Sequence, residues 1–142
     1  MEKTYPITVD YSKTLVEMIE AGNYDWINSG ITDEHFPIKR RKKSINIELI
    51  NYNTGMRSNE VLEDLGKRGL RPATLPELLA FGTAYPDRQR DVPIVALGSV
   101  WWCESNWSYS AGLGHDNRGR VLDLESWNAK WRSSVRFAAV RK

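Results

Sequence analysis

The sequence predicts an α+β domain with two helices, a small mostly antiparallel sheet and a loop-rich binding face. Three observations predict this class. Ile45, Ile47 and Leu49 alternate with polar residues, which is the pattern of a strand with one side in water. The stretch TLPE at 74–77 is a capping box that begins a helix. After residue 93, short apolar runs separated by polar residues predict strands joined by long turns.

The elements are predicted in chain order from local patterns. Leu15, Met18 and Ile19 recur at helical spacing, and Gly22 is suited to end that helix. Ser58 is the expected N-cap of the next helix. The full set is a strand at 5–9, the helix ending at Gly22, an irregular stretch at 23–44, a strand from Ile45, helices at 58–68 and 74–84, and strands at 94–100, 121–124 and 135–141.

The predicted core comes from the apolar positions of these elements. The strand from Ile45 is expected to lie near the last strand, and no third long helix is expected within 100–142. The residues expected to be buried are Leu62, Leu65, Leu78, Leu79, Ile94, Val95, Leu97, Leu122, Phe137 and Ala139.

Length and composition indicate one globular domain. The chain has 142 residues, of which 41% are hydrophobic and 27% are charged, and a formal net charge of +2. No apolar run approaches the roughly 20 residues that span a bilayer, so no membrane partner is expected. A lone Cys103 and an N-terminus without an apolar signal region predict a reducing, cytoplasmic location.

Two motifs carry a resemblance to a known family. The segment GLRPATLPELLAFG at 69–82 and the ending VRFAAVRK resemble the C-type lectin fold, in the disulfide-free form shared by formylglycine-generating-enzyme-like proteins and the variable proteins of diversity-generating retroelements. The resemblance implies a single domain with a core over 45–142, an N-terminal elaboration over 1–44 and a ligand face at about 101–134. The chain departs from that pattern at Leu78 and Val135, where those families commonly have Trp and Gly.

Five of the six tryptophans lie between Trp101 and Trp131, among serines, asparagines and glycines. Such a mixture is typical of binding surfaces, in which rigid rings give contact area and small polar groups adapt. The same rings could instead fill the core of a small β lobe. Trp102, Trp107 and Tyr109 are predicted to be exposed, because few apolar neighbours surround them. For Trp101 a place in the core is favoured, and for Trp127 and Trp131 core and surface are equal alternatives.

The resemblance implies a ligand-binding set within this segment. In an extended run, Ser126, Asn128, Lys130 and Arg132 would point the same way. The full set is Trp102, Glu104, Asn106, Trp107, Tyr109, His115, Asn117, Arg118, Ser126, Asn128, Lys130 and Arg132.

Metal and enzyme chemistry are not expected. Calcium-dependent lectins carry a Pro in one triplet and an Asp in another, and Glu104–Asn106 and Trp127–Ala129 lack them. The formylglycine-generating relatives use two cysteines, and related iron enzymes use a histidine cluster. Here Cys103 is alone, so no metal, cofactor or catalytic residue is predicted. A nucleophile made of Cys103, His115 and Asp116 stays an alternative.

The run KRRKK at 39–43 is most simply a solvated turn before the strand at Ile45. It would also suit phosphates, so a nucleic-acid-associated protein is a less favoured alternative. The favoured function is a non-enzymatic binding module, similar to retroelement-diversified variable proteins, whose partner is an unknown protein or other macromolecule. An enzyme of the formylglycine-generating-like family with an unrecognised site is the other alternative.

Overall fold

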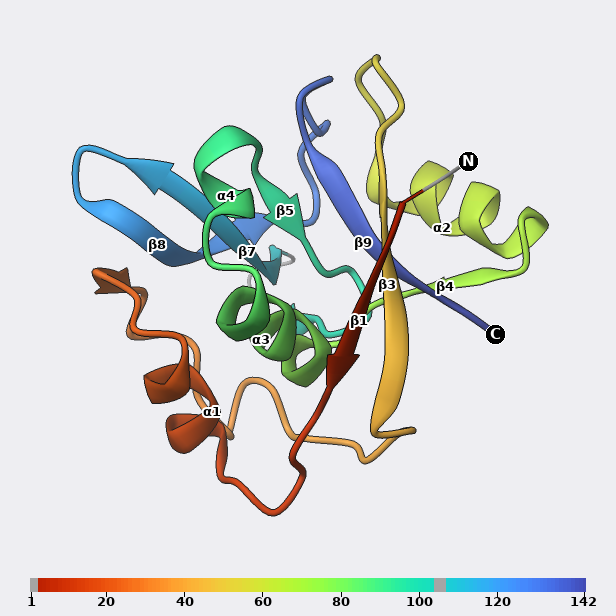
Figure 1. Cartoon of the computed structure of the whole chain (residues 1–142). Helices are drawn as coiled ribbons and strands as arrows, with labels where there is room; N and C mark the ends of the chain where they lie inside the picture. The colour runs from red at the N-terminus through yellow and green to blue at the C-terminus, as the bar shows by residue number, and fades with distance from the viewer. Residues whose placement is uncertain (1–2, 104–106) are drawn as a thin grey trace.

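A computed structural model describes residues 3–103 and 107–142. In these residues the chain forms nine strands and four helices (Figure 1). The elements are β1 (Thr4–Thr8), α1 (Leu15–Ala21), β2 (Trp26–Ile27), β3 (Ser44–Ile50), α2 (Ser58–Lys67), β4 (Leu70–Pro72), α3 (Leu75–Ala84), α4 (Arg88–Asp91), β5 (Ile94–Val95), β6 (Trp101–Trp102), β7 (Ser108–Asp116), β8 (Gly119–Ser126) and β9 (Arg136–Arg141).

All nine strands belong to one mixed sheet in the order β1-β3-β9-β5-β7-β8-β2, with β4 beside β9 and β6 beside β7. The pairs β5–β9 and β2–β8 are parallel and the others are antiparallel. The predicted fold class, two helices with a small mostly antiparallel sheet, is therefore wrong. The chain is mainly β, and β3 pairs with β9 as predicted for the strand from Ile45.

The sheet is larger than predicted because residues 108–116 form a strand. Its serines and glycines are typical of loops, but the neighbouring strands pack closely at Gly112. A Cβ on Gly112 would lie 3.2 Å from Cγ of Glu125 and 3.4 Å from the carbonyl of Ile94. Alternate residues such as Ala111 and Leu113 are buried, so the strand keeps an apolar face.

The predicted strand at 94–100 is shortened to Ile94–Val95. The chain turns at Gly98, whose N–H donates to the carbonyl of Ala73 at 2.8 Å. A Cβ at Gly98 would lie 2.5 Å from that oxygen, so only glycine fits this close approach. Ala96 and Leu97 stay buried although they leave the sheet.

The helices at 58–68 and 74–84 are confirmed as α2 and α3. Thr74 and Glu77 make the predicted capping box, in which the Thr74 N–H donates to Glu77 at 2.9 Å. The residue that caps α2 is Arg57, not Ser58, and its N–H donates to Glu60 at 2.8 Å. No third long helix occurs in the described residues after 100, as predicted.

Residues 1–44 supply both outer strands of the sheet, since β1 and β2 lie at its two ends. The predicted irregular stretch 23–44 thus contains the strand β2. Figure 1 shows α1 and α3 near each other and α2 on another side. One apolar cluster joins Leu15, Leu79 and Ile47, while a second joins Val61, Leu65 and Phe137. The sheet therefore has a core on each face.

Nine of the ten predicted core residues are buried, and Leu62 is only half-buried. The prediction of one wet side for the strand from Ile45 is wrong at Glu48. This carboxylate is buried and lies 3.1 Å from Nε of Arg141, because both faces of the central strands are covered.

Candidate functional site

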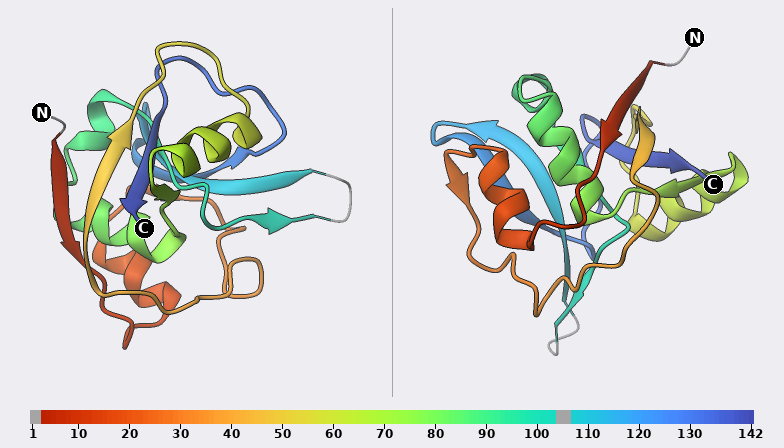
Figure 2. Two further views of the ribbon diagram at one scale, coloured as in Figure 1. Left: turned by 90° about the vertical axis from the view of Figure 1, so that its right-hand side faces the viewer. Right: turned by 60° about the horizontal axis from the view of Figure 1, so that its bottom comes forward.

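Strands β6 and β7 form a hairpin that reaches outward from the body of the protein (Figure 2). Two tryptophans near its end are largely in solvent, since Trp102 is 68% exposed and Trp107 is 52% exposed. Exposure of both rings was predicted. Large aromatic rings exposed to solvent are a feature of binding surfaces.

The β8–β9 connection holds this end of the hairpin. The Trp127 N–H donates to the Ser108 carbonyl at 2.8 Å, and the Ser108 N–H donates to the Asn128 side chain at 2.7 Å. The indole of Trp127 also meets that of Trp102 edge-on, with ring centroids 5.8 Å apart. We call Trp102, Trp107 and Trp127 the aromatic tip.

Trp101 lies on the opposite face of the hairpin, because neighbouring residues of a strand alternate. Its indole stacks on the His35 imidazole with centroids 3.6 Å apart and an interplanar angle of 8°. Nδ1 of His35 lies 2.7 Å from the Gly30 carbonyl. Tyr109 packs beside Trp101 and is half-buried, so its predicted exposure is wrong. These contacts hold β6 against the N-terminal segment.

A groove of about 610 Å³ runs along the β7–β8 hairpin. Gly112, Leu113 and Gly114 of β7 are among its lining residues. Among the predicted site residues, those that line the groove are His115, Arg118, Ser126, Lys130 and Arg132.

Charges of both signs line this groove. Hydrogen bonds from Arg118 hold the pKa of Asp116 below its ordinary value. Partial desolvation of the carboxylate raises the pKa of Glu125. The charge of Asp123 adds to this rise, and the charge of Arg132 opposes it. The groove therefore does not favour a ligand of one charge.

A second hollow of about 360 Å³ lies between the base of the hairpin and the segment after Phe36. Trp102, Lys39 and Arg41 line it together with the start of α3 at Pro76. We call this hollow the basic cleft. Lys39 and Arg41 were not predicted as site residues, although the run KRRKK gave a signal for them.

The residues of the predicted ligand set therefore lie in several separate parts of the structure. Trp102 lines the basic cleft, Asn117 lies exposed at the β7–β8 turn, and Asn128 bonds the hairpin. Glu104 and Asn106 lie outside the described residues. The expected extended run at 126–132 is wrong, because the chain turns at 127–128 and sends the Asn128 side chain to Ser108.

The alternative nucleophile is not assembled. Cys103 lies beside Trp107 at one end of the hairpin, where its N–H donates to the Trp107 carbonyl. His115 pairs with Arg120 at the other end of β7. His115 lies eight positions after Trp107 along an extended strand, which corresponds to roughly 27 Å.

Two further observations concern residues 3–103 and 107–142. No group of three or more His, Cys, Asp or Glu side chains in them is arranged to hold a metal ion. Their helices include none that is long and apolar enough to cross a membrane.

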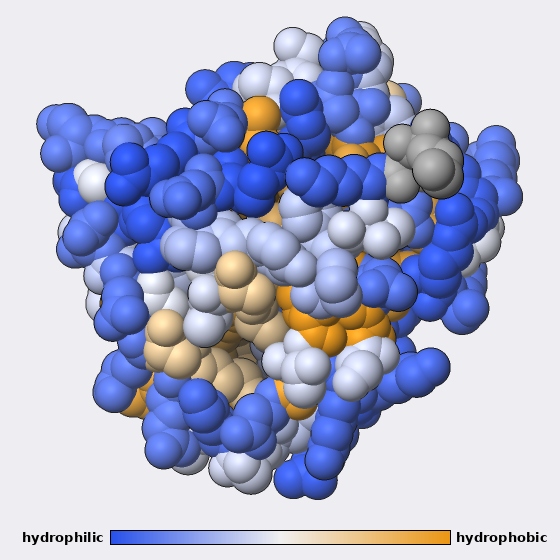
Figure 3. All heavy atoms as spheres, viewed as in Figure 1, coloured by the Kyte–Doolittle hydropathy of each residue, from blue (hydrophilic) through white to orange (hydrophobic). Residues whose placement is uncertain are grey.

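An apolar hollow of about 180 Å³ lies between α1 and α3, lined by Met18, Leu79 and Ala80. Figure 3 shows apolar residues gathered over these helices on an otherwise largely hydrophilic face.

Comparison with known proteins adds no further guide to the site, since no family model, curated protein or solved structure matches the chain.

Proposed function

We propose that the chain is a non-enzymatic binding module that holds a macromolecular partner through its aromatic tip. The observation that carries this proposal is the exposure of Trp102 and Trp107 at the end of a projecting hairpin. The chain does not need these rings for its cores, whose members are the buried residues of the two clusters.

The energetics of the tip favour binding. Burial of apolar surface contributes about 25 cal/mol for each Å², and a Trp offers up to about 250 Å². Trp102 already packs against Trp127, and a backbone hydrogen bond holds Trp127 to Ser108. This contact restricts the Trp102 ring before binding, which reduces the conformational entropy that is lost when a partner covers it.

The separation of Cys103 from His115 supports a role without catalysis, since a thiol needs a nearby base for activation. A cytoplasmic location belongs to the same proposal, and the single cysteine supports it.

Descent from retroelement-diversified variable proteins is a separate proposal, supported by the Trp, Ser and Asn content of residues 101–134. The expected genomic finding is a reverse transcriptase gene and a near-copy of the 3′ end of this gene nearby. A gene with neither neighbour would overturn this proposal and leave the binding module unaffected.

Trp102→Ala with Trp107→Ala tests the binding module. Immobilised wild-type and double-variant protein are exposed to extract of the source cells, and the retained macromolecules are compared. The control is Val16→Ala, which trims another exposed apolar side chain, 58% exposed on α1.

We expect the double variant to fold and to lose a partner that wild type and the control both retain. A folded double variant that retains the same partners as wild type would overturn the proposal. Circular dichroism and thermal unfolding establish that each variant is folded.

A further inference from the structure

The basic cleft joins two features that lie about 60 residues apart in the sequence, the run at 39–43 and the exposed indole of Trp102. Figure 2 shows the segment that leads into this run passing beside the hairpin in both views. The run therefore lies beside an aromatic ring, although its only aromatic neighbour in the sequence is Phe36.

The charged side chains in the described lining of the cleft are of one sign. Lys39 and Arg41 are its charged lining residues, and its described lining contains no carboxylate. Asp33 and Glu34, the closest acidic residues before the run, do not line it. Neither Lys39 nor Arg41 forms a salt bridge with any carboxylate in the described part of the chain. The cleft thus favours an anionic ligand, unlike the groove on β7–β8.

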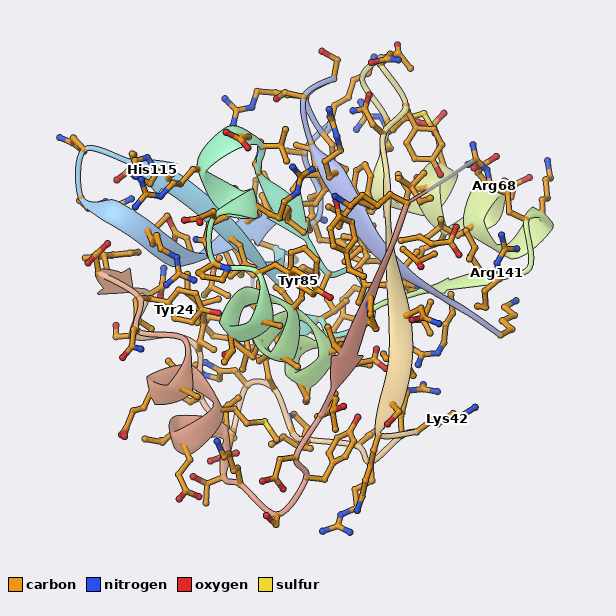
Figure 4. The ribbon with its side chains drawn as sticks, viewed as in Figure 1. Tyr24, Lys42, Arg68, Tyr85, His115 and Arg141 are labelled. Atoms are coloured by element: carbon orange, nitrogen blue, oxygen red, sulfur yellow. The ribbon has the colours of Figure 1, made fainter. Side chains whose placement is uncertain are left out.

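The basic run is held in place at two points. Arg40 donates to the Tyr11 carbonyl at 3.3 Å, and the Val9 N–H donates to the Lys43 carbonyl at 2.9 Å. Lys39, Arg41 and Lys42 are exposed, and Figure 4 shows Lys42 pointing away from the body. The backbone is therefore fixed while the cationic side chains stay in solvent.

The back of the cleft is also fixed. Oγ of Ser99 accepts a 2.8 Å hydrogen bond from the Leu75 N–H, and the Ser99 carbonyl accepts a 3.0 Å hydrogen bond from Ser110. These bonds join the start of α3 to the hairpin. The backbone that leads into Trp102 is therefore fixed against the start of α3, which also lines the cleft.

From these observations we propose that the basic cleft binds single-stranded nucleic acid, with a base on Trp102 and phosphates near Lys39 and Arg41. The inference rests on the proposed function, because it names the partner of the aromatic tip. Stacking on an aromatic ring with cations along the backbone is how proteins hold single strands of many sequences. A duplex offers phosphates but keeps its bases stacked, so it cannot use the Trp102 ring.

The test is fluorescence anisotropy with a labelled single strand of about 12 nucleotides, a length in the range of known single-strand sites. Oligo(dT) and oligo(U) distinguish single-stranded DNA from single-stranded RNA as the ligand. A duplex of mixed sequence measures the binding that comes from phosphate charge alone. The variants are Trp102→Ala, Trp102→Phe and the pair Lys39→Ala with Arg41→Ala. The matched charge control is Lys67→Ala with Lys142→Ala, which removes two exposed cations at α2 and the C-terminus.

We expect Trp102→Ala to weaken single-strand binding by about 5- to 100-fold, the value of one stacked base, and Trp102→Phe to weaken it less. Loss of Lys39 and Arg41 should reduce the slope of log K against log salt by about 1.4. The Lys67 and Lys142 control should change neither quantity.

Absence of single-strand binding would overturn the inference, as would equal binding of duplex and single strand or equal effects of the two charge variants. These results leave the binding module standing if Trp102→Ala with Trp107→Ala still loses a partner from extract. Binding that the aromatic variants leave unchanged would overturn the inference too.

Discussion

The indole Nε1–H of Trp131 donates a 2.8 Å hydrogen bond to Oγ of Ser58. The same hydroxyl donates at 2.8 Å to the carbonyl of Trp127. Both Ser58 and Trp131 are buried, and Trp131 meets Phe137 edge-on with centroids 5.8 Å apart. The first residue of α2 therefore fixes the turn that carries Trp127 into the aromatic tip.

Ser58→Ala is expected to lower the free energy of unfolding by about 1–3 kcal/mol, because it leaves the buried Trp131 N–H without an acceptor. Urea unfolding followed by tryptophan fluorescence measures this change. Exposed Ser133→Ala is the control and should change stability by less than about 0.5 kcal/mol. Equal stability of Ser58→Ala and wild type would show that the bond contributes nothing.

The helices were predictable from sequence because their signals are local. Thr74 and Glu77 lie three residues apart. The cap and the apolar face of α3 both come from one short stretch of the sequence. The strand β7 was not predictable in this way. Gly112 packs closely against Glu125 and Ile94, which belong to the neighbouring strands and are distant from it in the sequence. Alternation of small and apolar residues is a weak signal unless the neighbouring strands are known.

In the candidate site, too, the features with local signals were predictable and those that depend on long-range contacts were not. Exposure of Trp102 and Trp107 followed from their polar neighbours in the sequence and is confirmed. The meeting of Trp102 with Lys39 and Arg41 depends on how the N-terminal segment runs past the hairpin. A long-range contact of this kind leaves no local pattern in a single sequence.

The two cores give a paired prediction. Leu78 of α3 is fully buried in the core that includes Leu15 of α1, and Phe137 of β9 is 2% exposed in the core that includes Val61 and Leu65 of α2. Leu78→Ala and Phe137→Ala should each lower the free energy of unfolding by about 2–5 kcal/mol, because each leaves a cavity. Chemical denaturation measures both, with exposed Val16→Ala as the control. A loss below about 1 kcal/mol in either variant would contradict a close-packed core on that face.

Arg120 is buried with carbonyl groups as its main partners. Its guanidinium donates to the carbonyls of Gly22, Gly82 and Pro86 and lies 4.8 Å from the centre of the Tyr24 ring. One side chain of β8 thus joins the end of α1, the last turn of α3 and the loop before α4. Sequence alone offered no signal for this role.

Arg120→Met keeps much of the side-chain volume and removes these donors, so the carbonyls lose their partners. We expect the free energy of unfolding to fall by about 3 kcal/mol or more, since each unsatisfied buried group costs about 1–3 kcal/mol. Arg90→Met removes a guanidinium that is 59% exposed and should cost less than about 0.5 kcal/mol. Similar losses in the two variants, measured by urea unfolding, would contradict a special role for Arg120.

Tyr24 connects burial to pH dependence. Its ring lies between α1 and α3, its side chain points toward α3 in Figure 4, and its hydroxyl is buried with no hydrogen-bond partner in the described residues. Burial raises the pKa of Tyr24 from 10.0 to about 12, although the Arg120 charge opposes the rise. The folded protein therefore keeps the Tyr24 proton at pH values where the unfolded chain has released it.

The sign of the effect follows from this difference. Below about pH 10 both states hold the proton, so the raised pKa does not alter stability. Between about pH 10 and 12 the unfolded chain loses its proton first, so the free energy of unfolding falls as pH rises. Tyr24→Phe removes the ionisation and should show a shallower fall, with little change near neutral pH because the lost hydroxyl had no partner. Urea unfolding of both proteins from about pH 8 to about pH 11 measures the two slopes. Parallel slopes would mean that Tyr24 ionises as readily in the folded protein as in the unfolded chain, and that its hydroxyl is not shielded between α1 and α3.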